Sequence, residues 1–298
     1  MSCTCNKCQC HVSSLAKKYL MALSGLVLAA FALVHMIGNL QMFQSPEHIN
    51  VYAHFLQHLP PPALWGFRGV MLLAVLVHAV TGISLALENR AARPETYAVK
   101  NTRAATFAAK TMPYTGLVLF AFIVFHILHY TVKAPASLGT GAFHATLTTD
   151  IHAKLFGVFD YPLFKGEVVN DCYNMVVAGF SNPVFSAFYV VSMLLVAFHL
   201  SHGIASLFQT FGLRNEKWRK PLTLLAAAYG VILFGGLAAV PTAVLAGKFA
   251  PQTKCAMAVK ARHSPNGSAI FTPGAADVAT PYAKPCCEKN TIVDIPAR

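Results

Sequence analysis

Residues 184–208 read VFSAFYVVSMLLVAFHLSHGIASLF, a stretch without a single Asp, Glu, Lys or Arg. At a helical rise of about 1.5 Å per residue, this stretch is long enough to cross the ~30 Å hydrocarbon core of a bilayer. It also carries His199 and His202, and an ionisable residue inside a membrane is costly enough to mark a functional site. The stretch therefore predicts a membrane-spanning helix that takes part in the function of the protein.

Four more stretches of this kind predict a multi-pass membrane protein. They cover about residues 19–43, 64–87, 113–132 and 222–246. The 298-residue chain is 55% hydrophobic and only 11% charged, with a mean hydropathy of +0.52, which lies outside the usual range of soluble domains. We expect an all-α fold of five transmembrane helices.

The first of these stretches could also be read as a secretory signal peptide. It follows Lys17 and Lys18 and contains Ala30-Phe31-Ala32, which is typical of a cleavage site. The apolar run nevertheless continues past that site to Phe43. A retained membrane helix is therefore the favoured interpretation.

Basic residues in the connections predict the orientation of the chain. The net charge of +12 lies mainly between the apolar stretches, so we attribute it to membrane topology and expect no nucleic-acid partner. The connections rich in Lys and Arg are those before the first span, between the second and third, and between the fourth and fifth. Five crossings then place the N-terminus in the cytoplasm and the C-terminus outside.

This topology divides the chain into three parts. We expect a cysteine-rich cytoplasmic tail at 1–14, a membrane domain at 15–247 and an external, mostly irregular tail at 248–298. The connection at about 134–182 is too long for a simple turn and contains several aromatic residues. We expect it to form a folded external cap.

Histidines recur in the first four predicted spans and not in the fifth: His35, His78, His126, His129, His199 and His202. For any one of them, a hydrogen bond to a neighbouring helix would be a sufficient explanation. Each histidine lies in the second half of its span, and successive spans run in opposite directions. The histidines should therefore lie at two depths, an outer level with His35 and either His126 or His129, and an inner level with His78 and either His199 or His202.

Two facing imidazoles at one depth are what a bis-histidine haem requires. The pattern thus predicts two haem b groups, one joining the first and third spans and one joining the second and fourth. Gly38, Gly82 and Gly203 lie three or four residues after a histidine and would let a flat macrocycle approach the backbone. Ordinary close packing of membrane helices explains them equally well.

Several motifs together resemble a known family. They are His35-Met36-Ile37-Gly38-Asn39, Ala53-His54-Phe55-Leu56 with Leu59-Pro60, His78-Ala79-Val80-Thr81-Gly82, Thr115-Gly116, Phe125-His126, Phe198-His199-Leu200-Ser201-His202-Gly203 and Phe211-Gly212-Leu213. Over about residues 15–247 the chain resembles the diheme cytochrome b membrane anchor of the succinate dehydrogenase and fumarate reductase family, in its single-chain, five-helix form.

The resemblance implies a ligand set and a set of partners. It makes His126 the partner of His35 and His199 the partner of His78, and it leaves His129 and His202 to haem propionates or to packing. It implies a multi-pass protein of the bacterial cytoplasmic (inner) membrane that passes electrons between an iron-sulfur subunit and quinone, provisionally menaquinone. A flavoprotein subunit would oxidise succinate, so this chain would have no dicarboxylate site.

The quinone site is poorly marked in the sequence. The candidates in the connection before the second span are Glu47, His54, Gln57 and His58, which could relay protons near the outer haem. A solvated loop is the competing interpretation for each of them.

The cysteines lie outside the predicted spans. Cys3, Cys5, Cys8 and Cys10 are close enough in sequence to bind a soft metal such as zinc, although a tail with incidental thiols is the alternative. Under the predicted topology, Cys172, Cys255, Cys286 and Cys287 are external, where disulfides persist. A disulfide between the tail and the cap is one hypothesis.

Two other functions compete with the family assignment. A diheme cytochrome b of another quinone-linked enzyme, such as a hydrogenase or formate dehydrogenase, would also use membrane histidines. A transporter with a histidine-lined proton or metal path would use them without haem.

Overall fold

The structure is a computed structural model that describes residues 12–92, 107–134, 138–141, 143–147, 150–155 and 159–252. The chain divides into two units, Met1–Pro251 and Gln252–Arg298, and the description below concerns the first. Seven of the cysteines and nearly all of the predicted external tail lie outside the described residues.

Five long helices confirm the predicted spans. They are α1 (Ser14–Leu40), α3 (Pro61–Ala91), α4 (Phe107–His126), α6 (Pro183–Thr210) and α7 (Glu216–Leu245). A 3-10 turn, η1 (Gln41–Phe43), extends α1, and a π-helical turn, η2 (Ile127–Val132), extends α4. Each of the five is long and apolar enough to cross a membrane, within the described residues.

Most of these helices begin before the apolar stretch that predicted them, because their N-caps are polar. The side chain of Ser13 accepts from the backbone N of Ala16 at 3.2 Å. Asn182 accepts from the N of Val184 at 2.9 Å and starts α6 in the same way. A cap must satisfy the free N–H groups of the first turn, so a polar residue ahead of the hydrophobic run sets the true start of the helix.

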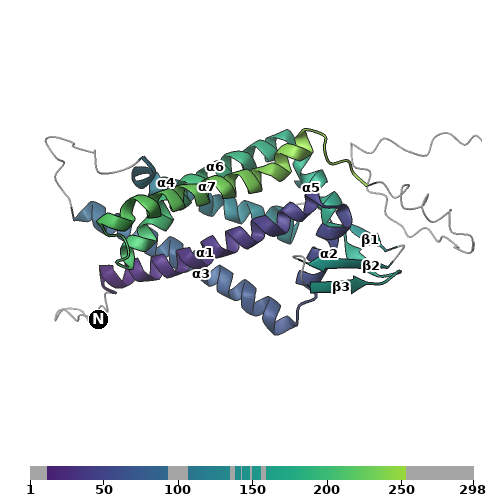
Figure 1. The fold of residues 1–298 in the computed structure, drawn as a ribbon, viewed down its shortest axis with the longest axis horizontal. Coiled ribbons are helices and arrows are strands. Elements are labelled where there is room, and N and C mark those ends of the chain that lie inside the picture. The colour runs from purple at the N-terminus through teal and green to yellow at the C-terminus, as the bar shows by residue number, and fades with distance from the viewer. Residues whose placement is uncertain are drawn as a thin grey trace, which may run out of the picture. The chain divides into compact units, whose positions relative to one another are not determined.

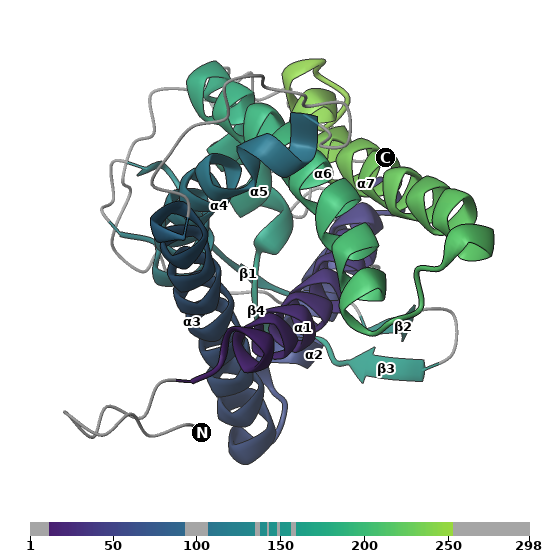
Figure 2. The ribbon, with the colours of Figure 1, turned by 90° about the vertical axis from the view of Figure 1, so that its left-hand side faces the viewer.

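The four histidine-bearing helices form a closed bundle. α1 packs against α3 and α6, and α4 packs against the same two helices, while α7 lies along α6 and α1 (Figure 2). The contact between α6 and α7 depends on Gly230, where an added Cβ would lie 2.7 Å from the carbonyl oxygen of Ala197. The helix without histidines is thus an outer support of the bundle.

Chain direction alternates within the bundle. α1 ends, and α3 and α6 begin, beside the elements gathered at one end of the bundle (Figure 1). At the other end, Lys17 and Ser14 at the start of α1 both bind the carboxylate of Glu88 near the end of α3. The antiparallel arrangement puts the second half of α1 and the second half of α3 at opposite ends, as the two-level prediction requires.

The segments at the first end form a cap. It contains α2 (Pro46–Gln57), α5 (Cys172–Phe180) and two antiparallel strand pairs, β1 (His144–Thr146) with β4 (Val168–Asn170) and β2 (Ile151–Leu155) with β3 (Phe159–Leu163). The strands depart from the all-helical expectation. In β4 an exposed Val168 precedes Val169, which is 1% exposed, and this alternation is the period of a strand.

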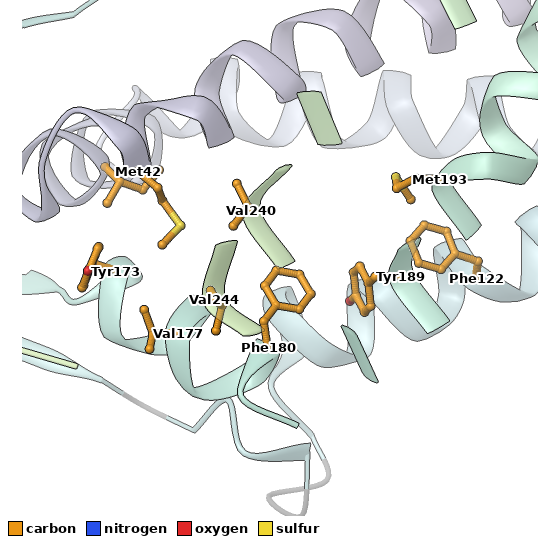
Figure 3. Close-up of a cluster of buried hydrophobic side chains, with 10 residues drawn as sticks. Met42, Phe122, Tyr173, Val177, Phe180, Tyr189, Met193, Val240 and Val244 are labelled. Carbon is orange, nitrogen blue, oxygen red and sulfur yellow. The ribbon is translucent and has the colours of Figure 1, made fainter. Parts of the chain in front are cut away.

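A hydrophobic core built from residues of both the cap and the long helices joins the cap to the bundle. The residues are Met42, Ile49, Phe122, Tyr173, Val177, Phe180, Tyr189, Met193, Val240 and Val244, most of them labelled in Figure 3. Polar contacts hold the cap's own helices together, because Asn50 of α2 donates to Asp171 at 3.2 Å and accepts from the backbone N of Tyr173 at 2.9 Å. In the same core, Tyr189 near the start of α6 packs between Phe180 of α5 and Phe122 of α4.

Candidate functional site

Four of the predicted histidines come together as two pairs. The rings of His35 (α1) and His126 (α4), the first histidine pair, have centroids 5.7 Å apart and planes at 84°. The rings of His78 (α3) and His199 (α6), the second histidine pair, have centroids 6.2 Å apart and planes at 66°. Two imidazoles that share one metal ion through metal–nitrogen bonds of about 2 Å have ring centroids roughly 6 Å apart. Both pairs have the spacing of two ligands of one ion.

The surroundings of His78 set its tautomer. Its Nδ1 lies 3.1 Å from the carbonyl oxygen of Met21, which can only accept a hydrogen bond. Ser24 donates to the carbonyl oxygen of Leu20 at 2.7 Å, so its hydroxyl has no second proton for His78. Nδ1 of His78 therefore carries the hydrogen, and Nε2 keeps a free lone pair for a metal.

His199 is held in the same tautomer by a hydroxyl group. Its Nδ1 lies 3.1 Å from Oγ1 of Thr115. The Thr115 hydroxyl has one proton, and carbonyl oxygens of its own helix lie 3.1 Å away at Met112 and 3.2 Å away at Thr111. When the proton goes to one of these carbonyls, the Thr115 oxygen accepts from Nδ1 of His199, and Nε2 of His199 is free. Metal-binding histidines usually have such a fixed partner on the other nitrogen.

The first histidine pair is built differently. His35 stacks on Phe31, with centroids 5.3 Å apart. Nδ1 of His126 lies 3.3 Å from the hydroxyl of Tyr189, and Nδ1 of His129 lies 3.0 Å from the same hydroxyl. His129 is completely buried, whereas Tyr189 is 5% exposed. The phenol of Tyr189 thus contacts both His126 of α4 and His129 of η2.

Two glycines adjoin the second histidine pair. An added Cβ at Gly25 would lie 3.0 Å from Cε1 of His78, and one at Gly116 would lie 3.4 Å from Cε1 of His199. Larger residues here would crowd the rings. At Gly38 the structure shows close packing, the alternative explanation, because an added Cβ would lie 2.6 Å from the ring of Tyr52. Beside Gly203 an added Cβ would meet nothing within 4 Å.

The donor set fits haem better than a metal held by protein alone. Across the described ranges, no group of three His, Cys, Asp or Glu residues comes close enough to hold a metal ion. A protein zinc site takes three or four such ligands. Two facing imidazoles per site are the number of ligands that a bis-histidine haem takes from the protein.

The remaining bundle histidine, His202, lies one turn beyond His199 and is half-buried. His129 is the corresponding histidine one turn beyond His126. Unlike His202, it is enclosed by the rings of Phe125, Phe185 and Tyr189. The two second histidines therefore have different environments.

Part of the candidate quinone region is brought together in the cap. The rings of His54 and His58 stack with centroids 3.8 Å apart, and Nδ1 of His54 lies 3.2 Å from the hydroxyl of Tyr161. Burial, and then the charge of His58, lower the pKa of His54, against an opposing effect of Glu167. Imidazole and phenol groups both donate and accept hydrogen bonds, so this cluster contains groups suited to proton exchange.

The other two candidates, Gln57 and Glu47, have different surroundings. Gln57 accepts a hydrogen bond from Asn170 of β4 and so joins α2 to the strands. Glu47 is exposed in the first turn of α2. The pKa of Tyr173 is raised mainly by burial, and the charges of Asp171 and Glu47 raise it further.

Cys172 is a free thiol at the start of α5. Burial raises its pKa to about 11, because a thiolate would be poorly solvated there. The hypothesis of a disulfide to Cys255, Cys286 or Cys287 involves partners outside the described residues, as does the hypothesis of a metal site at Cys3, Cys5, Cys8 and Cys10.

Comparisons with known proteins add no identification, since no protein-family model, curated protein or solved structure matches this chain.

Sequence reasoning did not identify three groups that orient the histidines. The carbonyl of Met21 carries no sequence signal, because every residue has one. Thr115 was visible as part of the Thr115-Gly116 motif, and Tyr189 as a polar ring in an apolar span, but only their positions against His199 and His126 give them a role.

Proposed function

We propose that this chain is a diheme cytochrome b of a membrane-bound electron-transfer complex. The observation that carries the proposal is the double pairing of histidines across four membrane helices, with ring centroids 5.7 and 6.2 Å apart. Two independent pairs with the same spacing are hard to explain as packing, because a hydrogen bond between helices needs only one histidine and any acceptor.

Haem iron, when bound, would supply the one-electron redox chemistry. The chain's own residues would fix its position and electronic environment. His35 and His126 would hold one group and His78 and His199 the other, with Met21 and Thr115 orienting the second histidine pair. The bundle would keep water and competing ligands away from both sites.

Among such cytochromes, we propose the anchor subunit of succinate:quinone oxidoreductase, of the succinate dehydrogenase and fumarate reductase family. The motifs at His35, His78, His126 and His199 support this assignment. The chain would be the non-flavin subunit of the enzyme, with flavoprotein and iron-sulfur subunits on the cytoplasmic side, in the bacterial inner membrane.

Quinone, provisionally menaquinone, would be the membrane partner. The stacked His54 and His58 beside Tyr161 support a proton-exchanging region at the cap end of the bundle. Under the orientation that the basic connections predict, that end faces outside and the second histidine pair lies nearer the cytoplasm.

The first test is spectroscopic. Detergent-purified protein should show a b-type spectrum on reduction with dithionite and two haem b groups per chain by the pyridine haemochrome assay. A chain that binds no haem would exclude every cytochrome assignment and favour the transporter with a histidine-lined path.

Co-purification separates the two cytochrome assignments. Recovery with a flavin-containing partner and succinate:quinone activity would support the succinate dehydrogenase and fumarate reductase family. Recovery with a hydrogenase or formate dehydrogenase catalytic subunit would instead support the second candidate.

A further inference from the structure

The hydroxyl of Tyr189 occupies a position that none of the motifs assigns. It lies 3.3 Å from Nδ1 of His126 and 3.0 Å from Nδ1 of His129, and it comes from α6, which packs against both α4 and α1. A phenol has one proton to donate and can also accept. Its one proton can go to only one of the two histidines, so at least one of them must donate to its oxygen.

The hydrogen bonds His126–Tyr189–His129 form a relay, and the direction of its protons decides which histidine has Nε2 free. A histidine that donates from Nδ1 leaves Nε2 with a lone pair, whereas a histidine that accepts at Nδ1 carries its proton on Nε2 and cannot use that nitrogen as a ligand. At least one of the two histidines is therefore a potential ligand, and the one that receives the phenol proton is excluded.

The position of His35 selects the direction. The ring of His126 is the one that lies 5.7 Å from the ring of His35. The ring of His129 is instead packed against Tyr130 at 4.2 Å and Phe185 at 5.3 Å, and it is fully buried. His126 must then be the donor and His129 the acceptor.

We propose that Tyr189 is a positioning residue of the first histidine pair, which accepts the Nδ1–H of His126, donates to Nδ1 of His129 and so presents Nε2 of His126 to the metal. This inference rests on the proposed haem-binding function and extends it to a residue outside the ligand set.

The packing of Tyr189 allows a clean test of its hydroxyl. Its ring meets Phe122, Phe180 and Phe188 edge-on, with centroids 5.1, 4.9 and 6.3 Å away. Tyr189→Phe keeps these aromatic contacts and removes only the oxygen. Tyr229→Phe is a matched control, because the hydroxyl of Tyr229 donates to the carbonyl oxygen of Ala29 at 2.6 Å rather than to a histidine.

The expected readout is a reduction potential. A ligand imidazole that donates its second N–H is more basic and favours the oxidised iron, so loss of the acceptor should shift the equilibrium toward the reduced form. We expect the redox equilibrium constant of one haem to change by roughly three- to tenfold, which is ~30 to 60 mV for a one-electron couple. The other haem should keep its potential.

A second substitution identifies the affected haem. Thr115→Val removes the acceptor of His199 and should raise the potential of the other haem only. Dye-mediated redox titration of the wild type, Tyr189→Phe, Thr115→Val and Tyr229→Phe therefore tests whether each hydroxyl acts on its own pair. Loss of one haem in Tyr189→Phe, with the other unchanged, would support the same role.

Several results would overturn the inference. Equal shifts in Tyr189→Phe and Tyr229→Phe, no shift in Tyr189→Phe, or loss of both haems in that variant would show that the hydroxyl does not position His126. These results require a wild-type protein with two haems and leave the proposed function intact. A wild-type protein without haem would overturn the function itself and this inference with it.

Discussion

Replacing one histidine of a pair with leucine should remove one haem and leave the other. We expect His126→Leu to lower the haem content from two per chain to one, and His199→Leu to do the same at the other pair. His35→Leu should match His126→Leu, and His78→Leu should match His199→Leu, because each pair of variants removes ligands of one ion.

The structure predicts that these variants still fold. Without His126, the Tyr189 hydroxyl keeps His129 at 3.0 Å, and without His199, the Thr115 hydroxyl keeps the carbonyl oxygen of Met112 at 3.1 Å. No buried polar group loses its last partner, so the cost is one hydrogen bond of about 1 kcal/mol. That is small beside a typical folding stability of ~5–15 kcal/mol.

The assay is haem per mole of protein by pyridine haemochrome, combined with a redox titration that resolves the remaining haem. His152→Leu is a control, because His152 is exposed on β2. The reasoning would be refuted if a single variant lost both haems. It would equally be refuted if His129→Leu lost a haem while His126→Leu kept two.

Three other substitutions or modifications test separate parts of the structure. Gly116→Leu should lower the haem content of the second pair, because even a Cβ there lies 3.4 Å from a ligand ring; Gly66→Leu, at a position with nothing within 4 Å, should keep both haems. Because burial and the charge of His58 lower the pKa of His54, modification of His54 by diethyl pyrocarbonate should persist below pH 6.5, and His58→Gln should move its midpoint upward; an unchanged midpoint would contradict the electrostatic coupling. Cys172, with its pKa raised to about 11, should resist iodoacetamide at pH 8 and react after unfolding without reductant; a requirement for reductant would show a disulfide instead.

The five spans could be predicted because hydropathy is a local property. A run of about 20 apolar residues must be a helix in a bilayer, since each backbone N–H and C=O needs a partner inside the segment. The depth of each histidine followed from the same facts, because rise per residue and alternating direction place a residue along the helix axis without any knowledge of its neighbours.

The cap was less accessible to sequence reasoning. Its length and aromatic content predicted a folded segment, but the short strands β1 and β4 contain only three residues each, too few to show a reliable alternation. Their pairing joins residues 22 to 26 positions apart, such as Ala145 and Val169, and depends on the packing of Val169 against Val51 of α2.

The sequence by itself therefore determined the number of spans, the histidines at each depth and the two possible partners at each level. The family resemblance added His126 and His199 as the expected partners, but only the tertiary structure could bring the rings together, because rotation about a helix axis and the neighbours of a side chain depend on packing between helices. It paired His35 with His126 and His78 with His199, and it placed Tyr189 and Thr115 against the second nitrogen of a histidine in each pair. It also gave the space beside Gly38 to Tyr52, since a ring from α2 reaches a position that helix periodicity alone left open.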